Sequence, residues 1–201
     1  MPRPRSLTPE QIAAAALAVI DEDGLAALTM RAVAARLRMG TMSLYRYVAD
    51  REQLEGLVVE SVLGRVDLVP PAGADWREQL AVLVERVRDA VGAHPEMVPL
   101  TMTHRQSSPG ILHWAETMLG ILAEAGVDGE RRVIALRSLL SYLIGAIQLE
   151  NLGALSGEGT RVMANLPAEE FPYLVETAGQ GRLIGQEEEF RRGLMILVGG
   201  L

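Results

Sequence analysis

Residues 29–51, TMRAVAARLRMGTMSLYRYVADR, constrain the fold of the chain more than any other stretch. Apolar side chains recur there at positions i, i+3, i+4 and i+7, which predicts a short helix with one apolar face: Met30, Val33, Ala34 and Leu37. Residues 38–40 interrupt the pattern, and a second helix over residues 41–48 is expected to bury Leu44 and Val48. Two short helices joined by a turn of three or four residues form a helix-turn-helix.

The same stretch carries an excess of positive charge. It holds five arginines and one aspartate (net +4) in a chain of net charge −7. Residues 1–51 hold 7 arginines and 5 acids (net +2), and residues 52–201 hold 12 arginines and 21 acids (net −9). Because an acidic body repels phosphates, contact with DNA is expected only on the N-terminal face.

At these residues the chain resembles a known family. Residues 7–63, above all LTMRAVAARLRMGTMSLYRYVADREQL, are similar to the DNA-binding domain of TetR-type (tetracycline-repressor-like) transcriptional regulators. The most specific part is MSLYRYV, followed by an acid, a base and Leu54. The segment FPYLVE…EEEFRRGLMILVGG also resembles the C-terminal body of one subgroup. The resemblance implies an all-α fold, with an N-terminal three-helix helix-turn-helix domain and a C-terminal helical ligand-binding and dimerisation bundle.

The resemblance assigns three side chains to the DNA backbone, because Tyr45, Tyr47 and Arg51 match family positions that hold phosphates. Thr29 stands at the start of its helix, where a hydroxyl and backbone N–H groups also bind phosphate. Such contacts position a protein on the duplex without identifying bases. For each residue taken alone, an exposed polar side chain is the alternative interpretation.

Base recognition is predicted at the start of the second helix. Thr41, Met42 and Ser43 lie at its N-terminal end, where base edges come within reach. Arg31 matches a family position that can reach a guanine, and a bidentate contact of this kind is worth about 1–3 kcal/mol. Arg46 suits either base or phosphate contact.

Three further arginines are candidates for DNA contact. Arg38 stands where the family usually has glycine, and a left-handed backbone there would cost on the order of 1 kcal/mol. This side chain is expected to reshape the turn or to face phosphate. Arg3 and Arg5 belong to an N-terminal arm that either enters a minor groove or remains a solvated tail.

Helical spacing continues through the rest of the chain, and no strand alternation is visible. The best break is VPPAG at residues 69–73, so residues 1–68 are expected to form the DNA-binding domain and residues 69–201 the effector-binding and dimerisation domain. Outside the helix-turn-helix, the predicted helices span residues 9–23, 51–66, 75–93, 95–103, 109–125, 128–152, 169–178 and 186–198, with a loop over 153–167. A capping box of Thr8 and Gln11 is expected to begin the first of these helices, and Asp50 and Asp128 are expected to cap those over 51–66 and 128–152.

The body is expected to enclose a small hydrophobic effector, because its helices are rich in methionine and leucine and poor in charge. The candidate pocket residues lie on helices that enclose the effector in the family: His104, His113, Trp114, Met118, Tyr142 and Gln148. The alternative for Trp114 and Met118 is an ordinary place in the core.

Residues 133–152 and 194–198 are too apolar for a monomer, because a helix that is hydrophobic on every face is buried on every face. TetR-type regulators pair their last two long helices into a four-helix bundle, and the resemblance implies a homodimer of this kind. The predicted interface residues are Leu140, Ile144, Ile147, Phe190, Leu194 and Leu197.

Other classes of protein are disfavoured by what the sequence lacks. There is no cysteine, which excludes disulfides and thiolate metal sites and agrees with a cytoplasmic location. The three histidines are spaced by ten and nine residues, which matches no metal motif, and no catalytic motif is present. The apolar run of residues 138–149 is shorter than the roughly 20 residues of a membrane span. No enzyme, metal, cofactor or membrane association is therefore expected.

The resulting hypothesis is a ligand-responsive transcriptional regulator, a repressor that binds a palindromic operator on double-stranded DNA as a homodimer and is released by its effector. The alternative is a dimeric helical ligand-binding protein without specific DNA binding. Salt-sensitive DNA binding separates the two, because a protein that neutralises phosphates releases their counterions.

Overall fold

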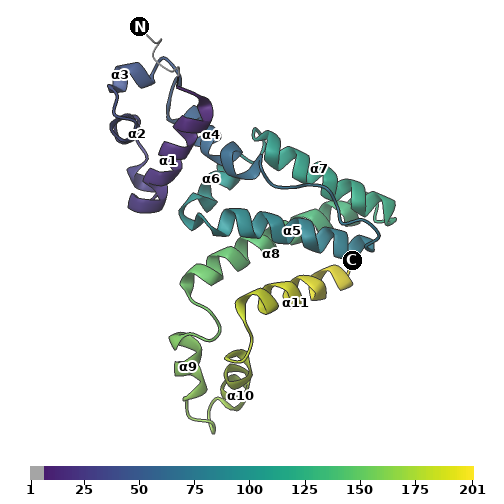
Figure 1. Ribbon diagram of the computed structural model, residues 1–201. Coiled ribbons are helices and arrows are strands. Elements are labelled where there is room, and N and C mark those ends of the chain that lie inside the picture. Colours follow the sequence, from purple (N-terminus) through teal and green to yellow (C-terminus); the bar gives the residue numbers. More distant parts are fainter. Residues whose placement is uncertain (1–6) are drawn as a thin grey trace. The chain divides into compact units, whose positions relative to one another are not determined.

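The computed structural model describes residues 7–201, and the regular secondary structure of these residues is entirely helical (Figure 1). Arg3 and Arg5, the predicted minor-groove residues, lie outside the described residues. Internal contacts divide the chain into two units. Unit 1 holds the described residues up to Val69 together with Asp89–Thr117, and unit 2 holds Pro70–Arg88 and Met118–Leu201. Helices α5 and α7 each contribute residues to both units.

Unit 1 is built around the first helix of the chain and the long helix that follows the helix-turn-helix, which pack against each other. Ile12 and Ile20 on one helix and Leu54 and Val58 on the other are fully buried. The elements of this unit are α1 (Pro9–Asp23), η1 (Leu25–Ala27), α2 (Met30–Arg36), α3 (Thr41–Leu44), α4 (Arg51–Leu63), the end of α5 (Trp76–Gly92), η2 (Pro95–Met97), α6 (Val98–Thr103) and the start of α7 (Pro109–Glu124).

Local signals explain where α1 and α4 begin. Thr8 and Gln11 form the predicted capping box of α1: the Gln11 N–H donates to Thr8 Oγ1 at 3.3 Å, and the Thr8 N–H donates to Gln11 Oε1 at 3.0 Å. Gly24, with φ +81°, ends the helix. Asp50 caps α4 as predicted, accepting from the Gln53 N–H at 2.8 Å. This helix ends at Leu63, three residues before the predicted Val66.

Unit 2 holds the first part of α5, the rest of α7, and four further helices: α8 (Gly129–Leu152), α9 (Glu158–Ala164), α10 (Pro172–Gly181) and α11 (Gln186–Gly199). Helix α8 packs against α11, and α9 packs against α10 (Figure 1). Three predictions were wrong. Residues 153–167 contain α9 rather than a continuous loop, α10 begins at Pro172 rather than residue 169, and the Asp128 side chain makes no capping hydrogen bond to α8.

Helix α8 is long and apolar enough to cross a membrane by length and composition alone. The charge-free run of residues 138–149 had predicted that this segment is too short to do so. Only 22% of its most apolar window is buried. Tyr142 and Glu150 of α8 are bonded to α11 and α5 of the same unit, as expected for a helix of a protein bundle. Much of the apolar surface of α8 is therefore exposed in the single chain.

Candidate nucleic-acid interface and ligand cavity

Helices α2 and α3 form the predicted helix-turn-helix. The Thr29 hydroxyl caps α2 by accepting from the Ala32 N–H at 3.1 Å. The two helices pack through Ala34 and Leu44, which are almost completely buried, so the small side chain on α2 permits a close crossing. The prediction of a helix over residues 41–48 was wrong beyond Leu44, where α3 ends. The Val48 N–H still donates a hydrogen bond to the Leu44 carbonyl at 3.1 Å.

The turn between α2 and α3 contains the departure from the family pattern. Arg38 has φ +55°, and it is the only non-glycine residue with a positive φ among residues 7–201. Backbone bonds hold this conformation: the Arg38 N–H donates to the Ala35 carbonyl at 3.0 Å, and the Met39 N–H donates to the Ala34 carbonyl at 2.9 Å. A side chain in the left-handed region costs on the order of 1 kcal/mol. The backbone at Arg38 is therefore held in a left-handed conformation at a cost in stability.

Most of the proposed DNA contacts face solvent. Met42 is 79% exposed, Tyr45 46% and Tyr47 39%. Large side chains left exposed on a small domain are consistent with a contact surface. The arginines Arg31, Arg38, Arg46 and Arg51 and the capping Thr29 are also exposed, whereas Thr41 and Ser43 are half-buried.

Two arginines of the basic stretch are already paired. Arg36 binds the Glu22 carboxylate through two hydrogen bonds of 2.5 and 2.6 Å. The hydrogen bond from Arg36 lowers the pKa of Glu22 and raises the pKa of Arg36 itself. Arg51 donates from Nε to Glu55 at 2.7 Å. The net charge of +4 counted from the sequence therefore overstates what is free to meet phosphates.

Helix α4 is tied to the segment that follows α6 in the same unit. The buried His104 ring lies 3.5 Å from Glu55 through Nε2, so Glu55 stands between His104 and Arg51. One turn further along α4, Glu60 accepts hydrogen bonds from the Ser108 hydroxyl at 2.9 Å and from the Gly110 N–H at 3.0 Å. Of the proposed DNA contacts, Arg51 is therefore the one with a polar connection to residues beyond the helix-turn-helix.

The six predicted pocket residues are divided between the units: His104, His113 and Trp114 lie in unit 1, and Met118, Tyr142 and Gln148 lie in unit 2. His104 faces the Glu55 carboxylate. Trp114 and Met118 are buried, whereas His113 and Gln148 are exposed. Of the six, Tyr142 lines a cavity of unit 2 formed by α8, α9 and α11.

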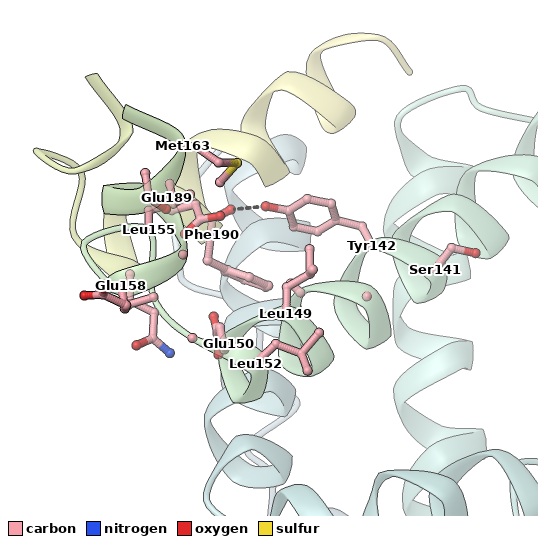
Figure 2. A pocket seen from close by; sticks show the side chains of 18 residues that line it. Ser141, Tyr142, Leu149, Glu150, Leu152, Leu155, Glu158, Met163, Glu189 and Phe190 are labelled. Atoms are coloured by element: carbon pink, nitrogen blue, oxygen red, sulfur yellow. Dashed lines mark hydrogen bonds between the residues drawn. The ribbon is translucent and has the colours of Figure 1, made fainter. Parts of the chain in front are cut away.

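That cavity, of about 600 Å³, is lined by the C-terminal half of α8, residues 153–157, α9 and the start of α11 (Figure 2). Tyr142 donates its hydroxyl proton to the Phe190 carbonyl at 2.7 Å, and their ring centroids are 5.3 Å apart. Arg88 lies 4.7 Å from the Phe190 ring and 2.8 Å from Glu150. Burial, reinforced by the charges of Glu189 and Glu150, raises the pKa of Tyr142.

One residue beside this cavity, a glycine within α11, was not identified from the helical spacing of the sequence. Gly193 interrupts the apolar stretch of α11, and a Cβ atom at this position would lie 2.3 Å from the Tyr142 hydroxyl oxygen. A glycine within a helix costs about 1 kcal/mol relative to alanine. Its presence in α11 is explained by the room that the Tyr142 hydroxyl needs.

The predicted dimer interface needs correction at three residues. Ile147, Phe190 and Leu194 are buried inside unit 2 and present no surface to a partner, while Leu140, Ile144 and Leu197 are half-buried. The side chains that the two helices leave exposed are different ones: Val133, Ile134, Leu149 and Leu152 on α8 and Ile196 on α11. The apolar excess was predicted correctly, but helical spacing alone did not identify the exposed face.

Metal-binding side chains are not clustered in the part of the chain that the structure describes. His94 bonds to Asp21 at 2.9 Å, His104 faces Glu55, and His113 is exposed. Each histidine thus has a separate environment.

Comparisons with known proteins agree with this architecture. The family model "Bacterial regulatory proteins, tetR family" matches residues 12–54, and "Tetracyclin repressor-like, C-terminal domain" matches residues 69–201. An HTH-type transcriptional regulator of Saccharopolyspora erythraea is 31% identical over 200 residues, covering 97% of this chain and 84% of the relative. The class A tetracycline repressor of transposon 1721 from Escherichia coli is 28% identical over 198 residues, covering 97% and 90%.

Solved structures show the same similarity. Apo ActR from Streptomyces coelicolor has a TM-score of 0.82 at 27% identity, covering 98% of this chain and 96% of ActR. ActR in complex with actinorhodin has a TM-score of 0.80 at 27% identity, covering 97% and 96%. The family inferred from residues 29–54 and the all-α fold are confirmed, and membership also confirms that the chain is not an enzyme. The chain belongs to the TetR family of ligand-responsive, DNA-binding transcriptional regulators.

Proposed function

We propose that the protein is a repressor that binds a palindromic operator as a homodimer and is released from it by a small hydrophobic effector. The observation that carries this proposal is the exposed surface of α3 and the following turn, where Met42, Tyr45 and Tyr47 are held outward by a buried Leu44. In a family of DNA-binding regulators, such a surface is suited to the major groove.

The contacts divide into positioning and base recognition. Tyr45, Tyr47, Arg51 and Thr29 position the protein on phosphates, with Arg38 as a further phosphate contact. Arg51 must leave Glu55, 2.7 Å away, to bind phosphate through Nε. Base recognition is assigned to the side chains that begin α3 and to two arginines: Thr41, Met42, Ser43, Arg31 and Arg46.

Two copies of the chain are needed to read a palindrome. The exposed apolar side chains of α8 and α11, of which Leu152 is 85% exposed and Ile196 80%, provide a surface that a second copy would bury. A two-fold dimer places its recognition helices about 34–36 Å apart, or a multiple of that distance. Such a regulator acts on DNA in the cytoplasm, without a membrane partner.

The proposed effector is a small organic molecule. ActR binds actinorhodin in its solved complex, and several relatives are tetracycline repressors, which supports a small organic molecule here. Binding must favour a dimer whose recognition helices no longer match the operator, and a coupling of about 1–3 kcal/mol is typical for such a switch.

The test is selection of bound sequences from a random duplex pool by the purified full-length protein at moderate salt. We expect enrichment of an imperfect palindrome and binding that weakens steeply as salt is raised. A folded, dimeric protein that enriches no sequence would support the alternative, a dimeric ligand-binding protein without specific DNA binding. The enriched duplex then serves as the reagent for effector screening.

A further inference from the structure

We infer that the cavity between α8, α9 and α11 binds a molecule with a positively charged nitrogen on an apolar body. The inference rests on the proposed effector-binding function and gives its ligand a chemical class. The cavity lies entirely within unit 2 and has a volume of about 600 Å³, within the range of small-molecule sites. Its lining includes no residue of α7, which carries the predicted effector contacts His113, Trp114 and Met118.

The walls of the cavity are largely apolar, which favours a ligand with a hydrocarbon or aromatic body. Figure 2 shows these side chains around the opening: Leu149, Leu152, Leu155, Met163 and Phe190.

Charge selects the ligand further. The residues that line the cavity include three glutamates and no arginine, lysine or histidine. Glu150 is neutralised by Arg88 at 2.8 Å, and Arg161 donates to Glu158 at 2.7 Å. Glu189 is half-buried and has no ion pair with the described residues. An anion would be repelled here, and a neutral body would desolvate a carboxylate without compensation.

Tyr142 adds a requirement for a hydrogen-bond donor. Its hydroxyl proton is already donated to the Phe190 carbonyl at 2.7 Å, so the oxygen can only accept from a ligand. An ammonium group, which has donors and no acceptor, satisfies both Tyr142 and Glu189. The neighbouring Phe190 ring already has the Arg88 guanidinium 4.7 Å from its centroid, which shows that a cation is tolerated on these aromatic faces.

The experiment measures direct binding to the full-length protein in the absence of DNA. Isothermal titration at pH 7 compares three probes with one aromatic body: 1-naphthylmethylammonium, 1-naphthalenemethanol and 1-naphthalenesulfonate. We expect the ammonium to bind about tenfold more tightly than the alcohol, which is the difference one charge-assisted hydrogen bond makes, and the sulfonate to bind most weakly. Equal affinities for all three probes, or no binding of the ammonium at millimolar concentration, would overturn the inference.

Two variants locate the site. Glu189→Gln should reduce the ammonium affinity about tenfold and leave the affinity for the alcohol unchanged. Glu187→Gln is the matched control, because Glu187 lies in the same first turn of α11 but does not line the cavity. Equal losses in both variants would reject the site, and circular dichroism with thermal unfolding establishes that each variant is folded. If either is unfolded, the wild-type preference among the three probes still decides the ligand class.

The effector role is tested separately, so that the two proposals fail differently. Release of the selected operator by 1-naphthylmethylammonium, abolished in Glu189→Gln, supports both. Binding that depends on Glu189 without operator release supports the ligand class and removes the cavity from the regulatory mechanism. Operator release by a compound that does not compete with 1-naphthylmethylammonium for binding places the regulatory effector elsewhere and leaves the ligand class supported.

Discussion

The helix-turn-helix and the cavity of unit 2 differ in how their side chains are brought together. The DNA contacts assigned in the proposed function all lie within residues 29–51, in α2, α3, the segments that flank them and the first residue of α4. The cavity instead collects side chains from residues 141–190, spread over three helices and a loop. A surface carried by one local motif is specified by short spacings, whereas a cavity depends on the packing of distant segments.

The two regions also differ in charge. The helix-turn-helix exposes arginines and hydroxyls around two tyrosines, and the cavity presents carboxylates around Tyr142 and Phe190. One chain with net charge −7 thus keeps a surface for an anion at one end of its sequence and a site for a cation at the other. Each prediction below tests one side of this comparison.

The largest effect is expected from Leu44→Ala. Leu44 anchors α3 with no exposed surface, and removing such a side chain costs about 2–5 kcal/mol of unfolding free energy because a cavity remains. Denaturant unfolding measures the loss, and operator binding should fall with it. Met42→Ala, two residues away and 79% exposed, is the control and should change stability by less than about 0.5 kcal/mol. Similar losses in both variants would show that α3 is not anchored as described.

Much of unit 1 was predictable because its signals are local. The capping side chains of Thr8, Thr29 and Asp50 each identified the start of a helix, and each makes the expected bond to the backbone. Arg38 was also recognisable as a strained position, since the family pattern has glycine there. Such signals span three or four residues, so tertiary packing had little chance to override them.

The site in unit 2 was not predictable in the same way. Helix α9 follows a glycine-rich segment and begins after Gly157, which provides no side-chain capping bond. The sequence therefore contains no capping signal that predicts the start of this helix. The burial of Ile147 and Leu194 and the exposure of Leu152 and Ile196 depend on which face of α8 meets α11. For helices that are apolar on most faces, spacing cannot distinguish the inner face from the outer one.

The division between base recognition and phosphate positioning is tested by Arg31→Ala and Tyr45→Ala. If Arg31 contacts a guanine, its loss should remove about 1–3 kcal/mol of discrimination at one base pair and leave binding to random DNA nearly unchanged. Tyr45→Ala should weaken binding to operator and random duplexes alike. Fluorescence anisotropy on both duplexes at fixed salt measures this. Equal losses on the two duplexes in both variants would refute the division.

On the cavity side, Tyr142→Phe should cost about 0.5–1.5 kcal/mol, the typical contribution of the hydrogen bond to Phe190. It should also change the response to alkaline pH. Burial raises the pKa of Tyr142 in the folded state, so the neutral form of the hydroxyl is favoured by folding. The stability that this preference contributes is complete below pH 10 and is lost as the pH rises further. Thermal unfolding between pH 8 and 11 should therefore show a smaller alkaline loss in the variant. An identical pH profile would mean that Tyr142 is not buried beside Phe190.

The smallest effect is expected at Arg38, where the helix-turn-helix departs from local preference. Arg38→Gly relieves the left-handed strain, but glycine also gains freedom in the unfolded chain, so the net gain in stability should be only about 0.5 kcal/mol. If the guanidinium faces phosphate, the same variant should weaken DNA binding and reduce the salt slope by about one. Arg38→Ala separates the two effects, because it removes the charge and keeps the strain. A glycine variant that is less stable than the alanine variant would show that this turn is unstrained. Unchanged DNA binding in both variants would show that Arg38 faces solvent.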